Sequence, residues 1–235
     1  MIATRSEYLK QLDDMDEAVA AFAEKACSDV AAATRALFGD AAAAKEVLSG
    51  VKAERRMRSA IEEGCLEIML LQQPLVAGDL RFVTGTFRLV SDLTHIDEMT
   101  RDVAYLAASL PADVSARLER ELKAASERVV AMVGLAVEAF RASDAERARA
   151  AISMDDEVDE LYSAAEDVVV DMIKASETRA KYLPELLMVA KYFERMGDDA
   201  VRIADWAVFR ATGEHETSVD SVIIPGDDEL AGLEG

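Results

Sequence analysis

The feature that most constrains the fold is an internal repeat. Placing residues 87–106 over residues 187–206, at an offset of 100, aligns apolar with apolar and acidic with acidic positions. The aligned pairs are Leu89 with Val189, Leu93 with Phe193, Ile96 with Met196, Glu98 with Asp198, Val103 with Ile203 and Ala104 with Ala204. Because similarity at a fixed spacing marks a repeated structural unit, the second half of the chain is expected to copy the first.

Few residues in the chain can interrupt a helix. Its 235 residues include 11 glycines and 4 prolines, and much of the 51% apolar content is alanine, which favours long helices. Helix-breaking residues and the 3.6-residue apolar period divide the chain into six helices. The expected helices cover about residues 6–37, 41–72, 79–110, 112–141, 145–176 and 182–212. Short loops between long amphipathic helices indicate antiparallel bundles, so we predict an all-α fold of two tandem three-helix bundles.

The predicted organisation has three parts. A first three-helix bundle covers residues 1–110, and a second covers residues 111–213, with the boundary near Pro111. Residues 214–235 carry seven acidic side chains and no lysine or arginine. This composition predicts a flexible acidic tail.

The net charge limits the classes of partner. A formal charge of −20 repels phosphates and so argues against nucleic acid and anionic membrane surfaces, which leaves cations and basic protein patches. The two cysteines, Cys27 and Cys65, lack CxxC spacing, so no disulfide framework or thiolate metal site is indicated. The N-terminal residues lack the pattern of a signal peptide, and no run approaches 18 apolar residues, so a cytoplasmic location is expected.

One predicted helix carries a strip of acids. At 100° per residue, Asp198 and Asp205 lie about 40° and 20° from Glu194, so three carboxylates of the helix at 182–212 share one narrow face. Asp155 and Asp159 have the same i, i+4 spacing on the helix at 145–176. If these helices pack side by side, the acids could surround a hard cation, which prefers several oxygen ligands.

Ordinary ion pairing is the alternative explanation. Lys191, Arg195 and Arg202 lie within one helical turn of the acids, so the strip could be a surface ion-pair seam. The run Asp155–Glu157 could equally be a set of first-turn acids. The sequence contains no readable nucleophilic motif and no Gly-rich phosphate loop, so no catalytic or cofactor-binding residues are assigned.

The first half preserves little of this acid pattern. Thr94 aligns with Glu194, while His95, Glu98 and Asp102 fall within about 60° of one face. These three could form a weaker second metal site. The alternative is a surface histidine that pairs with Glu98 or Asp102.

Two motifs resemble the PhoU family, which comprises cytoplasmic regulators of phosphate uptake and phosphate signalling. QQPLVAGDLRFV at 72–83 resembles the family's QPxAxDLR motif, and FERMGDDAVRIADW at 193–206 resembles its ERIGDxxxNIAE signature. The tandem three-helix halves also resemble the duplicated PhoU fold. The resemblance covers nearly the whole chain as far as Gly213.

The resemblance implies an adaptor and not an enzyme. PhoU proteins are implicated in restraining the phosphate ABC transporter, through its ATPase subunit, and the membrane sensor histidine kinase of phosphate signalling. By this resemblance the chain is expected to be a homodimer that reaches membrane complexes only through protein contacts. The alternatives are a carboxylate-bridged metalloenzyme on a helical bundle, or a PhoU paralogue with a different partner.

The resemblance also implies metal binding. PhoU proteins bind metal clusters through E/D-x-x-x-D motifs, and this would assign Asp155, Asp159, Glu194, Asp198 and Asp205 to a divalent or trivalent ion. Fe, Mn, Zn and Mg are not distinguished by these residues. The first half departs from the motif, since Asp97 replaces a glycine and Val51 and Arg55 replace acids of the second helix. We therefore predict asymmetric sites, the second competent and the first weakened or rebuilt around His95, Glu98 and Asp102.

Overall fold

The chain folds into helices and loops. The computed structural model describes residues 5–72, 74–175 and 179–216, and no strand occurs within these ranges. The helices are α1 Arg5–Leu37, α2 Ala41–Leu71, α3 Ala77–Ala107, α4 Ala112–Ser115, α5 Glu119–Ala142, α6 Ala145–Ile152, α7 Asp155–Lys174 and α8 Leu183–Thr212, with short 3-10 helices η1 Ala116–Leu118 and η2 Ala180–Tyr182. Most of the predicted acidic tail, residues 217–235, lies outside the described residues.

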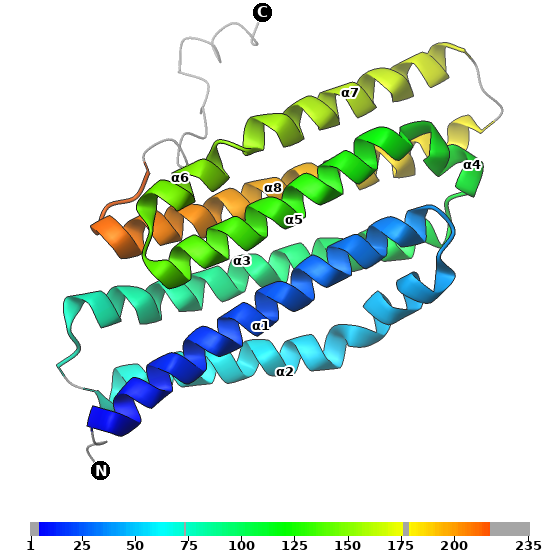
Figure 1. Ribbon diagram of the computed structural model, residues 1–235. Coiled ribbons are helices and arrows are strands. Elements are labelled where there is room, and N and C mark those ends of the chain that lie inside the picture. The colour runs from blue at the N-terminus through cyan, green and yellow to red at the C-terminus, as the bar shows by residue number, and fades with distance from the viewer. Residues whose placement is uncertain (1–4, 73, 176–178, 217–235) are drawn as a thin grey trace, which may run out of the picture.

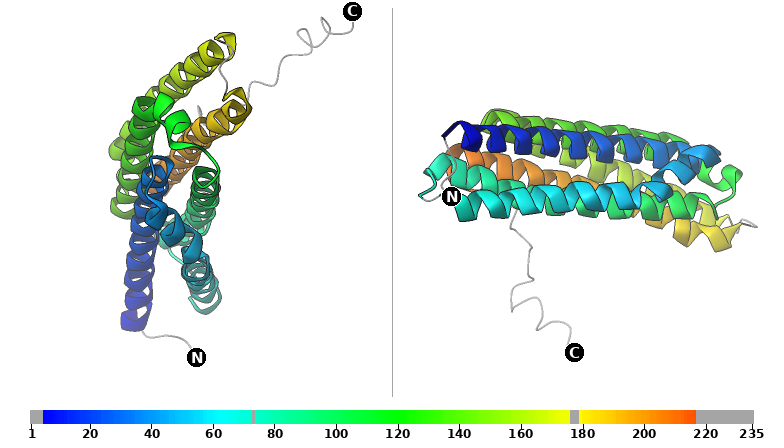
Figure 2. Two further views of the ribbon diagram at one scale, coloured as in Figure 1. Left: turned by 90° about the vertical axis from the view of Figure 1, so that its right-hand side faces the viewer. Right: turned by 90° about the horizontal axis from the view of Figure 1, so that it is seen from below.

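The long helices form two bundles (Figure 1). Helices α1, α2 and α3 pack on one another, and α5 packs with α8 and with the α6–α7 pair. The bundles join along α3 against α8 and along α1 against α5, and the helices run lengthwise through an elongated molecule (Figure 2). The predicted all-α fold of two three-helix bundles is confirmed. The hydrophobic core is continuous across both bundles, and the division into separate domains at residue 110 stays a prediction.

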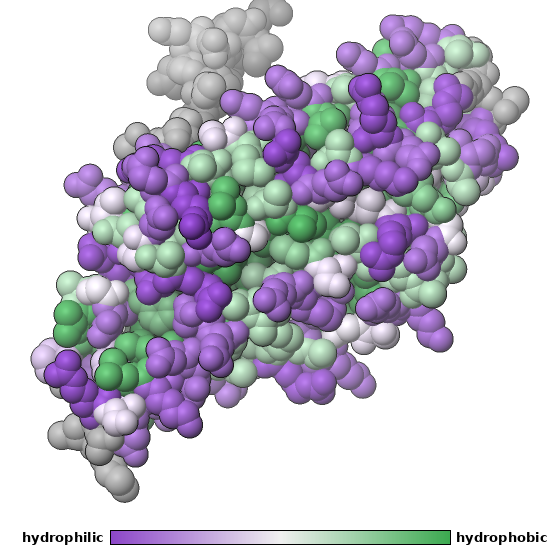
Figure 3. All heavy atoms as spheres, in the orientation of Figure 1, coloured by the Kyte–Doolittle hydropathy of each residue, from purple (hydrophilic) through white to green (hydrophobic). Residues whose placement is uncertain are grey.

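The repeated apolar positions form the core of both bundles. Leu93 and Phe193 are each 0% exposed, and the other aligned apolar positions are buried as well: Leu89, Val189, Ile96, Met196, Val103, Ile203, Ala104 and Ala204. On the face shown in Figure 3, hydrophilic side chains alternate with apolar patches. Within the described residues, no helix combines the length and apolar character needed to cross a membrane.

The prediction of one helix over residues 145–176 is wrong, because the structure has two helices, α6 and α7. Ser153 closes α6, since its backbone N–H donates to Arg149 O at 3.0 Å. A new helix starts directly after it, and its first turn holds the acids Asp155–Glu157. Negative side chains are favourable at a helix N-terminus, so the alternative of first-turn acids holds for this run. Similarly, the short elements α4 and η1 precede α5 in the segment expected to be one helix from residue 112.

Candidate metal centre

Helices α7 and α8 lie side by side where the acids were expected to meet. The two helices approach closely at Gly197, where a Cβ atom would lie 3.0 Å from Asp155 Oδ1 and 3.4 Å from Val158 Cγ1. A glycine therefore lets the first turn of α7 approach the backbone of α8. This contact brings Asp155 to the helix that carries Glu194 and Asp198.

Four of the five predicted acids share one electrostatic environment. Desolvation raises the pKa of Asp155 to about 7, and the negative charges of Asp159, Asp198 and Glu194 add to this effect. The pKa of Asp198 is also raised, first by desolvation and then by Glu194, while Arg202 and Lys191 partly offset the rise. Carboxylates that raise one another's pKa values in this way are a favourable environment for a cation.

The contacts of Glu194 fit both a metal ligand and an ion-pair partner. Its Oε1 accepts a hydrogen bond from Lys191 Nζ at 2.5 Å, as the ion-pair explanation requires, whereas its Oε2 is buried and has no hydrogen-bond partner. The four acids do not include three whose oxygens all lie within 4.8 Å of one another. Asp159 and Asp198 are exposed, so their side chains can turn toward a shared ion. The chemistry of the four carboxylates suits a hard cation, which prefers oxygen ligands.

Asp205 lies apart from these acids. Its Oδ1 accepts a hydrogen bond from the backbone N–H of Glu216 at 2.6 Å, and its Oδ2 pairs with His215 Nδ1. Seven residues separate it from Asp198, which is about 10 Å along a helix axis. Asp205 therefore holds His215 and Glu216, which follow α8, against this helix. The sequence did not indicate this contact.

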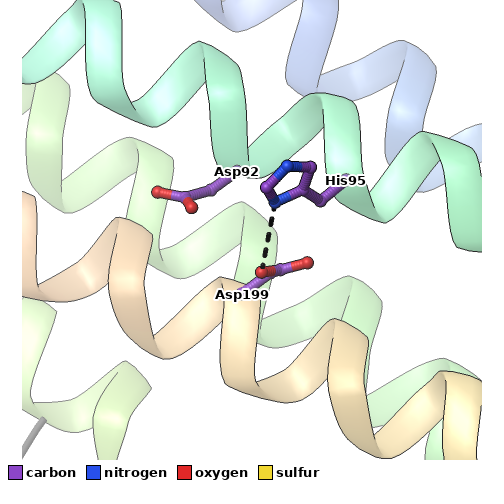
Figure 4. A group of neighbouring side chains, drawn as sticks. All are labelled: Asp92, His95 and Asp199. Carbon is purple, nitrogen blue, oxygen red and sulfur yellow. Dashed lines mark ion pairs between the residues drawn. The ribbon is translucent and has the colours of Figure 1, made fainter.

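A second group of polar side chains lines a cleft of about 610 Å³ between α3 and α8. The three residues predicted as a weaker site, His95, Glu98 and Asp102, all line it, together with Asp198 and Arg202 of α8. The donor atoms that lie within mutual reach, however, belong to His95, Asp92 and Asp199, all within 4.8 Å of one another (Figure 4). Asp92 was missed because nothing in the α3 pattern alone shows which acids face α8.

A third polar group lies inside the first bundle. The carboxylates of Asp29, Glu54 and Asp97 come within 4.8 Å of one another, and all three residues are buried. Lys25 pairs with Asp29, and Arg101 pairs with Asp97 and with Glu54 Oε2 at 2.8 Å. Desolvation raises the pKa of Asp97 to about 7, and a hydrogen bond with Glu54 adds to the effect. The acids of the first bundle are thus neutralised by the protein's own cations.

This group of buried acids was not predicted from the sequence, although the repeat contains a signal for it. At an offset of 100, Asp97 aligns with Gly197 and Arg101 aligns with Val201. An acid and a base therefore replace two small or apolar residues one turn apart on the same helix. Such a paired replacement indicates an ion pair that faces a neighbouring helix.

Comparison with known proteins supports one family. A family model described as PhoU domain matches residues 122–207. A phosphate-specific transport system accessory protein PhoU homolog of Aquifex aeolicus is 30% identical over 206 residues, which is 87% of this chain and 93% of that protein. PhoU homolog 1 of Methanothermobacter thermautotrophicus is 31% identical over 171 residues, covering 72% of this chain and 78% of the relative.

A solved structure has the same fold. The crystal structure of PhoU from Pseudomonas aeruginosa superposes with a TM-score of 0.79 at 26% identity, covering 88% of this chain and 100% of the other. The similarity therefore extends over both bundles and is not limited to one matched segment. On the sequence motifs, the duplicated helical fold and these relatives together, the chain belongs to the PhoU family.

Proposed function

We propose that the chain is a cytoplasmic negative regulator of phosphate uptake and phosphate-starvation signalling. It acts as a metal-binding adaptor, without a catalytic step, between the phosphate ABC transporter and a sensor histidine kinase. The observation that carries this proposal is the match, over 93% of its length, to a relative named as an accessory protein of phosphate-specific transport. The formal charge of −20 supports docking on basic protein surfaces and not on nucleic acid.

The metal of this proposal is held by Asp155, Asp159, Glu194 and Asp198. Support comes from the contact of α7 with α8 at Gly197 and from the unpartnered, buried Oε2 of Glu194. Carboxylate oxygens suit a hard divalent or trivalent ion such as Mg, Mn or Fe, and they also bind Zn. When bound, the ion would fix the first turn of α7 on α8, and a fixed surface favours one docked state of a homodimeric adaptor.

Gene deletion with complementation tests the regulatory role. We expect the deletion strain to express phosphate-starvation genes in phosphate-rich medium, and the wild-type chain to restore repression. A chain with Glu194→Gln and Asp198→Asn should bind less metal and restore repression poorly. The matched control is Glu166→Gln, which changes an exposed acid of α7 outside the cluster and should behave as wild type. Normal repression in the deletion strain would contradict the proposed role.

A further inference from the structure

We propose that Asp92, His95 and Asp199 form a separate binding site for a divalent transition-metal ion between the two bundles. The site uses two residues of α3 and one of α8, so an ion bound here would link the first bundle directly to the second. This proposal does not depend on the regulatory role or on the acids of α7.

The separation of the donor atoms fits a shared ion. His95 Nδ1 lies 4.0 Å from Asp199 Oδ1, which is too long for a hydrogen bond. Two atoms that each lie about 2.0–2.2 Å from one ion can be separated by up to about 4 Å. Figure 4 shows the imidazole and both carboxylates directed into the space between α3 and α8. The His95 side chain is 55% exposed, so it can adjust its position to complete the coordination.

The two carboxylates are held in place by burial. Asp92 is 7% exposed and Asp199 is 2% exposed, and Asp199 Oδ1 pairs with the Arg202 guanidinium. Buried carboxylates need a cation or hydrogen-bond donors to offset the loss of hydration. Asp92 and Asp199 therefore need compensating positive charge where the two bundles meet.

Arg202 supplies that positive charge in the structure. Its guanidinium pairs with Asp199, and its Nε lies 3.3 Å from Asp92 Oδ1. Arg88 also acts on Asp92, because its charge lowers the pKa of this carboxyl group against the rise caused by burial. A divalent ion would take the place of the Arg202 charge at both carboxylates. Since the Arg202 side chain is 45% exposed, it can turn into solvent when an ion enters. Arg202 is thus an internal competitor of the metal, and its removal should strengthen metal binding.

The donor set selects the kind of ion. One imidazole nitrogen with carboxylate oxygens suits Zn²⁺, Co²⁺, Fe²⁺ or Mn²⁺, whereas Mg²⁺ and Ca²⁺ prefer oxygen ligands alone. The site therefore differs in chemistry from the all-carboxylate group on α7 and α8. This difference allows the two sites to be distinguished by spectroscopy.

Titration with Co²⁺ tests the proposal on the full-length chain. Asp155→Asn with Glu194→Gln provides a background in which the α7–α8 acids are weakened and the proposed site is intact. In this background we expect one Co²⁺ per chain and visible absorption bands that indicate a nitrogen ligand. His95→Ala changes an exposed side chain, so folding is not at risk, and it should weaken binding at least tenfold. His215→Ala, which removes the other of the chain's two histidines, should leave binding unchanged.

The competition from Arg202 provides a second, independent readout. Arg202→Gln should tighten Co²⁺ binding about tenfold in the same background, because the competing charge is removed. Weaker binding in this variant would overturn the proposal, since it would mean that Arg202 helps to hold the ligands. The proposal is also overturned if the background binds no Co²⁺, or if binding and the absorption bands survive His95→Ala.

Discussion

At Asp155, burial and neighbouring charges act directly on stability. This residue begins α7, lies against the backbone of α8 and faces the charges of Asp159, Asp198 and Glu194. Its pKa of about 7 exceeds the ordinary value of 3.8, so the folded protein binds this proton more tightly than the unfolded chain does. The resulting stabilisation is complete below about pH 4 and is lost as the pH rises through 7.

Replacing Asp155 by asparagine should therefore change the pH dependence of stability. With metal removed by a chelator, we expect Asp155→Asn to reduce the loss of unfolding free energy between pH 5 and pH 8. Part of the slope should remain, because Asp97 also has a pKa raised to about 7. Urea unfolding at each pH measures the effect, with Glu166→Gln as the control acid on the same helix. An unchanged slope in Asp155→Asn would refute this account of the α7–α8 contact.

The positions of individual acids show which parts of the site the sequence could predict and which it could not. Helical periodicity predicts that Glu194, Asp198 and Asp205 share one strip, but an angular pattern ignores position along the helix axis. Asp205 lies two turns further on and pairs with His215. Asp199 lies outside this strip, and it is buried where α3 packs against α8. The packing of helices on one another is a property of the tertiary fold, and the sequence pattern of a single helix does not predict it.

At the scale of elements, close contacts between helices depend on particular glycines. A Cβ atom on Gly85 of α3 would lie 2.7 Å from Cε2 of the Phe140 ring of α5. Phe140 is 0% exposed, so its ring cannot move aside without disturbing the core. Gly134 of α5 is different, because a Cβ atom there would meet nothing within 4 Å.

These two glycines should respond in opposite directions to alanine. Gly85→Ala should destabilise the fold by about 1–3 kcal/mol, the usual range for overpacking a core. Gly134→Ala should stabilise it by about 0.5–1 kcal/mol, because alanine restricts the unfolded chain and favours the helix. Chemical denaturation of the two variants and the wild type provides the comparison. Equal effects of the two substitutions would show that the contact between Gly85 and Phe140 is not tight.

Element boundaries show the limit of local signals. The ends of the predicted helices near Leu37, Leu71 and Thr212 agree with the structure, since Gly39, Pro74 and Gly213 mark them in the sequence. No glycine or proline marks the break between α6 and α7. The only local signal is the run of acids Asp155–Glu157, which is favourable in the first turn of a helix.

At the scale of the whole molecule, the two bundles differ in the exposure and ion pairing of their acidic groups. In the first bundle, Lys25 and Arg101 neutralise the acids Asp29, Glu54 and Asp97 from within. In the second, exposed Asp159 and Asp198 leave the acid group accessible to an external cation. The asymmetry of metal binding between the halves stays a prediction. The observed difference is one of exposure, because the acids of the first group are buried whereas Asp159 and Asp198 are exposed.

Removing the internal counter-ion should cost stability in a pH-dependent manner. The Arg101 side chain is 20% exposed, and its partners Glu54 and Asp97 are 4% and 3% exposed. Breaking such a pair leaves buried carboxylates uncompensated, so Arg101→Met should destabilise the protein by about 3 kcal/mol at pH 8. At pH 5 the loss should be smaller, because protonation of Asp97, whose pKa is already raised, removes one of the unpaired charges.

A surface pair of the same type provides the control for this prediction. Arg58 pairs with Glu62 at 2.8 Å, but their side chains are 41% and 25% exposed. Arg58→Met should therefore cost less than about 1 kcal/mol at either pH. Guanidinium unfolding of both variants at pH 5 and pH 8 measures the difference. If Arg101→Met were no more harmful than Arg58→Met, the acids of the first bundle would not need their internal cations.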